Sequence, residues 1–426
     1  MPPLPFTPRV VVYHQTHHTR DGQHAVSLLP LLGRNPTDAS ARPAVTHLVV
    51  AAIHLNGPDS AAGPITLNDH PPDHPRFSVL WEEVAALQAR GVRVLGLLGG
   101  AAQGSYARLD VALVGDGPAF ETAYAPLAAL VRARRLDGLD LDVEEPMSLR
   151  GIVHLVDRLR RDFGPRFLLT FAPVAAALLR PHDPRCNLSG FSYRDLERAR
   201  GHEIAWYHAQ FYCGWGDASQ PHMYAALVLG RGGGGGGDGN GNNEGGGGGD
   251  GEGWPAHRVV MGLVTNPANG AGFVPLDTVA SVVLQLQAAA AATPGARGGG
   301  WGLGFGGVAG WEYFNSLPGG EEKPWEWAEW MSAILGAQAA TDPAGRLHDA
   351  PVPSATTTTA ATAAVTIDTT ETTTRTTTTA GTLTMTALRT QEETTVTTAT
   401  EAEFDIDAGS DAPVPSAFVY ASETEE

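Results

Sequence analysis

Eight short apolar segments, separated by stretches with a helical pattern, constrain the fold of this chain more than any other feature. Each is no more than nine residues long and rich in Val, Leu, Ile or aromatic residues, as is typical of parallel strands buried on both faces. They lie at 9–14, 46–54, 92–98, 136–143, 166–172, 204–212, 258–264 and 307–313. Eight strand-then-helix units predict an α/β fold, a closed (β/α)8 TIM barrel, with a doubly wound open sheet as the alternative.

The stretches between these segments carry helix signals. Ser78 is expected to cap a helix that runs through Arg90, with Glu82 and Glu83 in its first turns and Gly91 just after its end. Similar patterns cover 118–134, 148–162, 276–292 and 325–335. We expect these helices to cover the outside of the barrel.

The composition excludes several classes of protein. The chain has 426 residues and a formal net charge of −18, so binding of nucleic acid through a basic surface is not expected. Two cysteines, Cys186 and Cys213, are too few to staple a small fold, and we expect free thiols. No segment has the roughly 18 apolar residues needed to span a bilayer. We therefore expect a monomer with neither a nucleic-acid nor a membrane partner.

Two segments of biased composition lie outside this pattern. Of the 24 residues at 230–253, 16 are Gly, and the G-x-x-x-x-G-K-[ST] pattern of a phosphate-binding loop is absent. Residues 337–426 are Thr-rich and hold 14 acidic and 3 basic side chains. Neither segment has the apolar residues to offset its ordering entropy. We expect a folded domain at 9–336 with a disordered insertion, followed by a disordered acidic tail.

The two ends of the chain bear on its location. Residues 1–8 lack a charged stretch followed by an apolar one, so the chain as written is expected to be cytoplasmic. A Thr-rich stalk is typical of secreted proteins, and a mis-annotated start would make the protein extracellular. Only in that case would Asn187-Leu188-Ser189 be a glycosylation sequon.

The fourth apolar segment carries a row of acidic residues, Asp137-Gly138-Leu139-Asp140-Leu141-Asp142-Val143-Glu144. Strand side chains alternate, so Asp140, Asp142 and Glu144 are expected inside the barrel, at the end where barrel chemistry takes place. Burial of three carboxyl groups together predicts a raised pKa for at least one of them, as a general acid near neutral pH requires.

Two alternatives to a general acid exist for the acidic row. A solvated acidic turn is disfavoured because the intervening residues are apolar. Three carboxylates could bind Mg²⁺ or Ca²⁺, but ligands spaced by two along one strand spread over roughly 13 Å, too far apart to meet at one ion.

The group His14, His17, His18 and His24 suggests a metal site, but loop histidines at the mouth of a cleft are the favoured interpretation. We expect neither a metal nor another cofactor.

The acidic segment resembles the D-x-x-D-x-D-x-E signature of glycoside hydrolase family 18, the chitinases and endo-β-N-acetylglucosaminidases, at all four acidic positions. Gln210-Phe211-Tyr212 resembles the Q-x-Y pattern of the plant-type and yeast-type subgroup. Residues 307–312, with Trp311, resemble the segment that supplies the tryptophan floor of the cleft. Leu97-Leu98-Gly99-Gly100 resembles the S-x-G-G element, with Leu97 in place of Ser, and Cys213 stands where Asn is common.

The resemblance implies a retaining mechanism in which the 2-acetamido group of the substrate is the nucleophile. Glu144 would protonate the leaving oxygen and then activate water. Asp142 would bind the acetamide N–H, and Asp140 would share a proton with it. The resemblance also makes Tyr212 a donor to the acetamide carbonyl, Trp311 the floor under the −1 sugar, and Asp137 a structural residue.

Further residues are weaker candidates for the cleft. Tyr13 ends the first strand, Gln210 shares a face with Tyr212, and Trp215 lies on the following loop. The alternative for Tyr212 and Trp311 is a role as core aromatics. Gly99 and Gly100 belong to the structural motif.

Three classes of function follow from these residues. The favoured one is a glycosidase that cuts β-1,4 linkages next to N-acetylglucosamine, in chitin or in the chitobiose core of N-glycans. About ten residues separate Val264 from the helix near Leu276, which is too few for the insertion domain of bacterial-type members. The open groove expected from this favours chitin. A glycan-binding barrel without turnover is disfavoured because Glu144 is present, and a structural cell-wall protein is supported by the tail alone.

Overall fold

The computed structural model describes residues 7–33, 42–230, 253–292 and 300–337, which all fall within one compact unit, Met1–His348. The predicted insertion, apart from Gly230 and Gly253, and the predicted tail, apart from Ala337, lie outside the described residues. Their disorder and the proposed domain limits therefore stay predictions.

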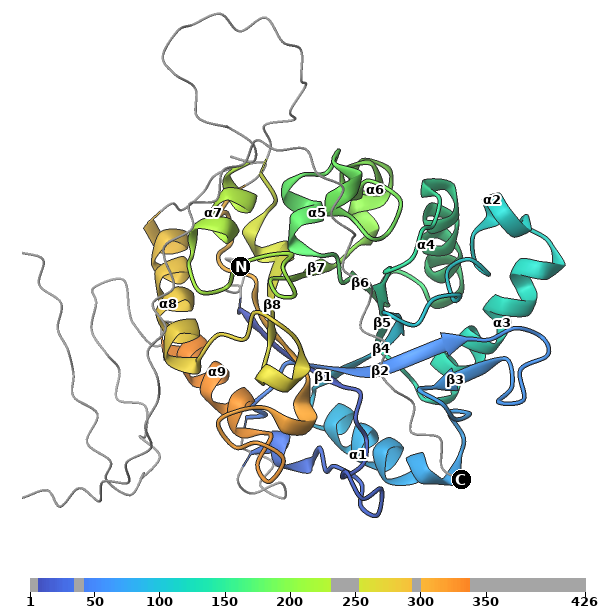
Figure 1. The fold of residues 1–426 in the computed structure, drawn as a ribbon, viewed down its shortest axis with the longest axis horizontal. Coiled ribbons are helices and arrows are strands. Elements are labelled where there is room, and N and C mark those ends of the chain that lie inside the picture. Colours follow the sequence, from blue (N-terminus) through green and yellow to red (C-terminus); the bar gives the residue numbers. More distant parts are fainter. Residues whose placement is uncertain (1–6, 34–41, 231–252, 293–299, 338–426) are drawn as a thin grey trace, which may run out of the picture. The chain divides into compact units, whose positions relative to one another are not determined.

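Eight parallel strands form a closed barrel (Figure 1). They are β1 (Arg9–His14), β2 (His47–Leu55), β4 (Arg93–Gly99), β5 (Gly138–Asp142), β6 (Leu168–Phe171), β7 (Trp206–Gln210), β8 (Val259–Val264) and β9 (Gly307–Trp311). The barrel closes because β1 pairs in parallel with both β2 and β9. All eight predicted strands are present, and the open sheet is excluded. A short strand that the sequence did not indicate, β3 (Ile65–Leu67), pairs antiparallel with β2.

Helices surround the strands (Figure 1). In the described residues they are α1 (Ser78–Ala89), α2 (Val111–Val114), α3 (Pro118–Ala133), α4 (Leu149–Phe163), α5 (Ala175–Leu179), α6 (Tyr193–Arg200), α7 (His222–Leu229), α8 (Leu276–Ala292) and α9 (Glu326–Ala337). The five longest are those that the sequence predicts. The shorter α2, α5, α6 and α7 were not predicted, because one or two turns carry too little periodicity.

Two helix starts test the capping predictions. Ser148 caps α4, where its side chain accepts a hydrogen bond from the backbone N–H of Gly151. Ser78 does not cap α1, and that prediction is wrong. A 3-10 turn at Pro75–Phe77 leads into the helix, so Phe77 holds the cap position and Ser78 is already helical.

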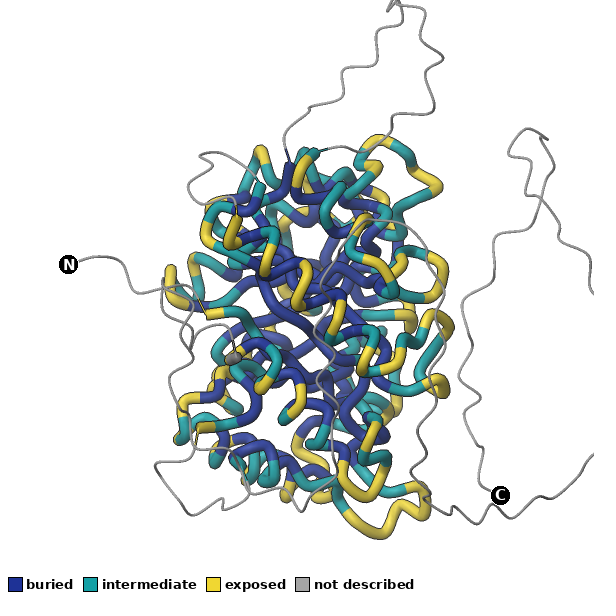
Figure 2. The backbone as a smooth tube through the Cα atoms, turned by 90° about the vertical axis from the view of Figure 1, so that its left-hand side faces the viewer, coloured by how far each residue is buried: buried dark blue, intermediate teal, exposed yellow. Residues whose placement is uncertain are grey.

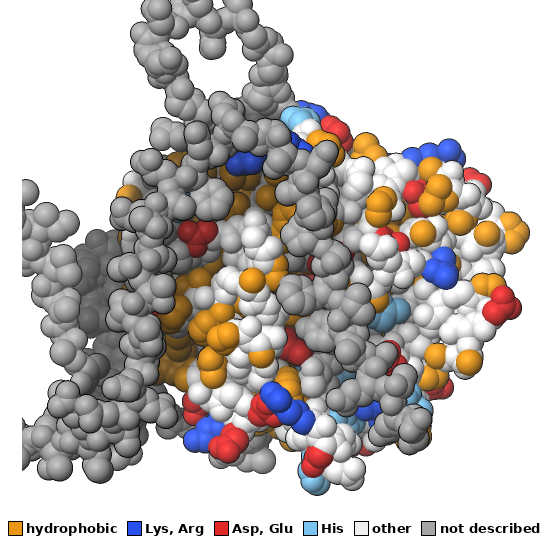
Figure 3. Space-filling model, in the orientation of Figure 1, with side chains coloured by type: hydrophobic (Ala, Val, Ile, Leu, Met, Phe, Trp, Pro, Cys, Tyr) orange, Lys and Arg blue, Asp and Glu red, His pale blue; other side chains and the backbone are white. Residues whose placement is uncertain are grey.

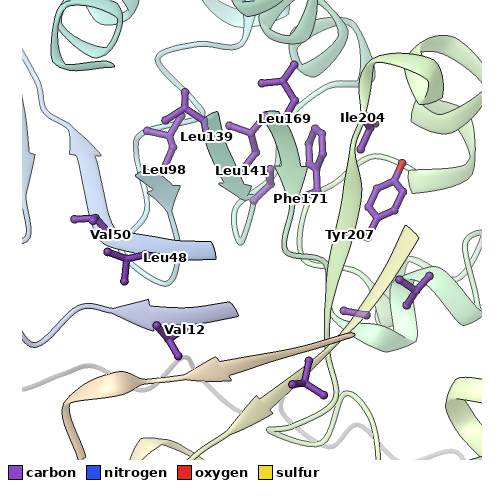
Figure 4. Close-up of a cluster of buried hydrophobic side chains, with 14 of the residues drawn as sticks. Val12, Leu48, Val50, Leu98, Leu139, Leu141, Leu169, Phe171, Ile204 and Tyr207 are labelled. Carbon is purple, nitrogen blue, oxygen red and sulfur yellow. The ribbon is translucent and has the colours of Figure 1, made fainter. Parts of the chain in front are cut away.

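The apolar core has two layers, and the buried stretches of the backbone run through the middle of the molecule (Figure 2). The larger layer lies between the strands and the helices, and Figure 4 shows Leu139 and Leu141 of β5 beside Leu169 of β6 within it. The smaller layer fills the barrel interior with Val11, Tyr13, Val49, Ala51, Ala52, Leu95, Leu97, Trp206, Val260 and Ala309. Because β5 presents leucines to the helices, its aspartates must face the interior.

The β8–α8 connection is short. Val264 ends β8 and Leu276 begins α8, with only a 3-10 turn at Pro267–Asn269 between them. The prediction that no insertion domain stands at this place is confirmed.

The surface and the helices bear on possible partners. Among the described residues that are visible in Figure 3, Lys and Arg side chains are scattered among acidic and apolar ones and form no continuous basic patch. Among the helices of the described ranges, none is both long and apolar enough to cross a bilayer.

Candidate active site

The acidic row lies at the carboxyl end of β5, as the alternation predicts. Asp140 and Asp142 are buried, and Glu144, which follows the strand end, is half-buried. Leu139, Leu141 and Val143 face the helices instead, in the larger core layer.

Asp140 is held by three donors from three different strands. Tyr13 Oη donates to Oδ2 at 2.7 Å, Thr170 Oγ1 donates to Oδ1 at 2.6 Å, and His208 Nδ1 lies 3.1 Å from Oδ1. Burial opposes ionisation here, but the interaction with His208 and the hydrogen bonds from Thr170 and Tyr13 outweigh it, and the pKa of Asp140 is lowered. Asp140 is therefore a carboxylate.

Asp142 and Glu144 behave in the opposite way. Burial, followed by the charges of Glu144 and Asp140, raises the pKa of Asp142 well above its usual value. Burial also raises the pKa of Glu144, against a hydrogen bond from Gln210 that lowers it. Two neighbouring carboxyl groups with raised pKa values retain a proton between them near neutral pH. This answers the expectation of at least one raised pKa in the row.

The proton expected to be shared between Asp140 and Asp142 stays a prediction. Both oxygens of Asp140 accept bonds from other donors. Gln210 Nε2 instead lies 3.2 Å from Asp142 Oδ1 and 3.1 Å from Glu144 Oε1. The lowered pKa of Asp140 and the raised pKa values of its two neighbours favour a proton on the pair Asp142 and Glu144.

Two glycines fit the end of β4 against Asp142. Gly99 and Gly100 both have left-handed backbone angles, with φ of 93° and 86°. The N–H of Gly100 donates to the carbonyl of Asp142 at 2.9 Å. A Cβ on Gly99 would lie 2.4 Å from the Tyr106 ring and 2.5 Å from the same carbonyl oxygen. Only glycine therefore allows this close approach.

A pocket at the acidic row brings five of the predicted site residues together, whereas Glu144, Asp140, Gly99 and Gly100 are not among its lining residues. It is lined by Tyr13, Leu97, Asp142, Ala172, His208, Gln210, Tyr212, Gly262, Ala309 and Trp311. Tyr13 and Trp311 meet edge to face, with ring centroids 5.6 Å apart. Burial and the charges of Asp142 and Glu144 raise the pKa of Tyr212 well above its usual value, so its hydroxyl stays protonated and can donate.

Trp215 and Asp137 also lie outside this pocket. Trp215 packs against the larger core layer and is not among the lining residues. Asp137 lies at the opposite end of β5, where it pairs with Arg93 at 2.8 Å and accepts from the N–H of Val94 at 2.9 Å. A structural role fits that position.

Sequence reasoning missed three residues around the row. His208 and Thr170 bond to Asp140, and buried Glu145 accepts from the N–H groups of Gly104 and Tyr106, each at 2.8 Å. The alternation on β7 could have indicated His208, since it shares a face with Gln210.

The histidines near β1 are not all loop residues at the mouth of a cleft. His14 and His17 are buried with ring centroids 4.8 Å apart, which corrects that interpretation. Burial, with the charges of neighbouring histidines, lowers the pKa of His14, and burial lowers that of His17 to about 3, so both are neutral. No group of three or more His, Cys, Asp or Glu side chains within the described ranges is arranged to hold a metal ion.

Known proteins were compared with the chain in three ways. No protein-family model and no curated protein sequence matches it. Several solved structures do match the chain. A fungal endo-β-N-acetylglucosaminidase of glycosyl hydrolase family 18 is 37% identical, with 77% of this chain and 98% of that chain covered and a TM-score of 0.61.

Two further structures agree in fold. A chitinase from Aspergillus fumigatus is 47% identical, with 77% of this chain and 99% of that chain covered and a TM-score of 0.58. A family 18 chitinase from Pseudoalteromonas aurantia is 17% identical, with 76% of this chain and 99% of that chain covered and a TM-score of 0.50. It supports the fold alone. The first two of these structures have sequence identities above one third and are covered over nearly their whole length. The geometry of the site also agrees with the sequence motif. The chain therefore belongs to glycoside hydrolase family 18.

Proposed function

We propose that this glycoside hydrolase cleaves β-1,4 linkages next to N-acetylglucosamine in chitin and its oligosaccharides, with retention and with help from the substrate. One observation carries the proposal. Asp140 accepts from three donors, and Gln210 Nε2 donates to both Asp142 and Glu144, whose pKa values are raised. This arrangement supplies one acid beside the Asp142 carboxylate, which fits the mechanism of this family, in which the acetamide of the substrate is the nucleophile.

The first half of the reaction uses the proton of the pair. Glu144, at the mouth of the barrel, donates it to the glycosidic oxygen as the bond to the anomeric carbon breaks. The acetamide oxygen of the −1 sugar attacks that carbon. Asp142 accepts the acetamide N–H and stabilises the positive oxazolinium by its charge. Tyr212 donates its hydroxyl to the acetamide oxygen and orients it.

The second half reverses the role of Glu144. As a carboxylate it takes a proton from water, which attacks the anomeric carbon from the face that the leaving group left. The acetamide is restored and the configuration is retained. Trp311, in edge contact with Tyr13, offers the flat apolar face of its indole to the sugar ring.

The choice of chitin rests on two supports. The A. fumigatus chitinase is 47% identical to this chain and the fungal endo-β-N-acetylglucosaminidase is 37% identical. The short connection between Val264 and Leu276 also leaves the cleft without an added wall on that side, which suits internal cuts in a long polymer. Action on N-glycan cores is the second candidate, supported by the 0.61 TM-score of the endo-enzyme.

Product analysis separates these candidates. The purified protein is incubated with soluble chitin oligosaccharides and, in parallel, with a high-mannose glycoprotein, with Glu144→Gln as the inactive control. We expect shorter oligosaccharides that appear first as the β-anomer, and an intact glycoprotein. Release of the glycan from the glycoprotein without chitin cleavage would select the endo-enzyme. Binding of both substrates without any turnover would refute the proposal in favour of a glycan-binding barrel.

A further inference from the structure

Three side chains project into the barrel from alternate positions of β7: Trp206, His208 and Gln210. The uppermost, Gln210, bonds to the acidic pair, as described above. The two below it have no role in the proposed chemistry, although both are buried polar groups at the centre of the barrel. His208 is 2% exposed, and the carboxylate that it faces, Asp140, is fully buried.

The tautomer of His208 is set by its neighbour on the strand. An indole N–H can only donate, and Trp206 Nε1 lies 2.7 Å from His208 Nε2. His208 Nε2 is therefore the acceptor, and its Nδ1 carries the proton. Nδ1 lies 3.1 Å from Asp140 Oδ1 and 2.8 Å from Tyr13 Oη. Tyr13 gives its own proton to Asp140 Oδ2, so its oxygen is free to accept from Nδ1.

The surroundings of this pair contain few charges. Below it, the guanidinium of Arg9 from β1 lies 4.1 Å from the centroid of the Trp206 ring. His47 from β2 lies with its ring centroid 4.8 Å from that of Trp206, and burial, with the charge of Arg9, lowers its pKa to about 3, so it is neutral. Above it, Asp142 from β5 is the next acidic group.

Other polar neighbours complete the environment of Asp140. Thr170 from β6 donates to it directly. The phenols of Tyr106 and Tyr212 also interact with its charge. On the β4 side, Leu97 stands at the position of the serine in the S-x-G-G pattern, and its hydrocarbon side chain cannot donate. The donors to Asp140 in this chain come from β1, β6 and β7 instead.

We propose that His208, held in one tautomer by Trp206, is a positioning residue that keeps Asp140 ionised and in place, so that the reacting proton stays on Asp142 and Glu144. The inference rests on the proposed function, because it assigns that proton a task in glycoside cleavage. Without the imidazole N–H, Asp140 would compete with Asp142 for the proton, and Glu144 would be a less effective acid.

The first test compares two variants of similar size. His208→Asn keeps an N–H donor near the position of Nδ1, whereas His208→Leu removes it. For His208→Leu we expect kcat on chitin oligosaccharides to fall by about tenfold, as for a lost hydrogen bond to a charged group, with KM nearly unchanged. The acidic limb of the kcat/KM profile should move to higher pH, because Asp140 then takes up a proton more readily. His208→Asn should restore most of the rate and the original limb.

The second test does not depend on turnover. In ¹⁵N NMR of the full chain, His208 should show a protonated Nδ1 and an unprotonated Nε2, and this pattern should be lost in Trp206→Phe. Trp81→Phe is the matched control, since that indole donates to the carbonyl of Pro72 at 2.8 Å, away from the barrel interior. The control should leave the His208 signals unchanged.

The outcomes separate the two proposals. Wild-type protein without activity on any N-acetylglucosamine substrate contradicts the proposed function, and the NMR pattern then decides the role of His208 alone. An active wild type together with a His208→Leu variant of unchanged kcat and pH profile overturns the positioning role. A protonated Nε2 on His208 overturns it as well, whatever the activity.

Discussion

The side-chain amide of Gln210 lies 3.1 Å from Oε1 of Glu144. An amide donor favours the ionised form of a carboxyl group, so this bond lowers the pKa of Glu144 while burial raises it. The balance sets the strength of the general acid. The same nitrogen also lies near Asp142, so one side chain orients both members of the pair.

Replacement of Gln210 by Met should shift the pH dependence. Without the amide, Glu144 keeps its proton to higher pH, so the alkaline limb of the kcat/KM profile should move upward. The rate at the optimum should fall by about tenfold, because both carboxyl groups lose a hydrogen bond. Steady-state kinetics across pH measure both effects.

Gln88→Met is the control for that variant. Gln88 donates its amide to Asp137 at 3.0 Å, at the far end of the barrel. The control should keep the wild-type pH profile. An alkaline limb that stays in place or moves downward in Gln210→Met would contradict the assignment of Glu144 as the acid.

Glu144→Gln should abolish turnover with little loss of binding. The amide keeps the shape of the side chain but cannot donate the acid proton, and general acid catalysis is worth about 10²–10⁴-fold in rate. We expect kcat to fall by at least that order, while the affinity for oligosaccharides, measured by calorimetry, stays close to wild type. A variant with wild-type kcat would exclude Glu144 as the acid.

The barrel was predictable because each of its strands is buried on both faces and therefore reads as a continuous apolar run. The acidic row was predictable for the opposite reason, since Asp140 and Asp142 interrupt such a run with strict alternation. His208 and Thr170 were not found, because a single polar residue in an apolar strand indicates a partner but not its identity. Their roles appear only when barrel closure brings β1, β6 and β7 around Asp140.

Local sequence also failed to predict the start of α1 and the position of Trp215, because both depend on contacts made in the folded protein. The cap of α1 depends on a 3-10 turn at Pro75–Phe77, which local propensity does not reveal. Trp215 follows β7 on a loop, and nothing in the sequence separates a loop aromatic that packs inward from one that faces the cleft.

Gly99→Ala should destabilise the protein and reduce activity together. The residue has a φ of 93°, and its Cβ would overlap the Tyr106 ring and the carbonyl of Asp142. Gly91→Ala is the matched control, with a φ of 86° and no atom within 4 Å of the added Cβ. Backbone strain alone costs on the order of 1 kcal/mol, so the control should lose only a few degrees in Tm. Gly99→Ala should lose clearly more, and its kcat should fall. Equal losses would contradict the close approach to Asp142.

Buried neutral histidines should make the fold sensitive to acid. Burial lowers the pKa of both His17 and His47 from the usual 6.5 to about 3. Above pH 6.5 the folded and unfolded states bind the same number of protons at these two histidines. As the pH falls from 6.5 toward 3, the unfolded chain binds protons first, so stability is lost, by about 3 kcal/mol per site at pH 4.

The acid effect can be assigned with two variants in urea unfolding between pH 7 and pH 4. His47→Gln should flatten the dependence of the unfolding free energy on pH, because one site no longer titrates on unfolding. The exposed His182 offers a control, and His182→Gln should keep the wild-type slope. Identical slopes in all three proteins would show that buried His47 does not govern the acid response.

Asp142 and the acetamide of the substrate should be required together. Asp142→Asn keeps a hydrogen-bonding side chain in the pocket but removes the charge that stabilises the oxazolinium, so kcat should fall by about 10²-fold or more. A substrate with a free 2-amino group in the −1 sugar lacks the attacking oxygen and should not be cleaved by the wild type. A thiazoline analogue of the intermediate should bind the wild type tightly and Asp142→Asn more weakly, because the carboxylate contributes to holding it. Efficient cleavage of the deacetylated substrate would mean that a protein group is the nucleophile, and the acidic row would then need a different mechanism.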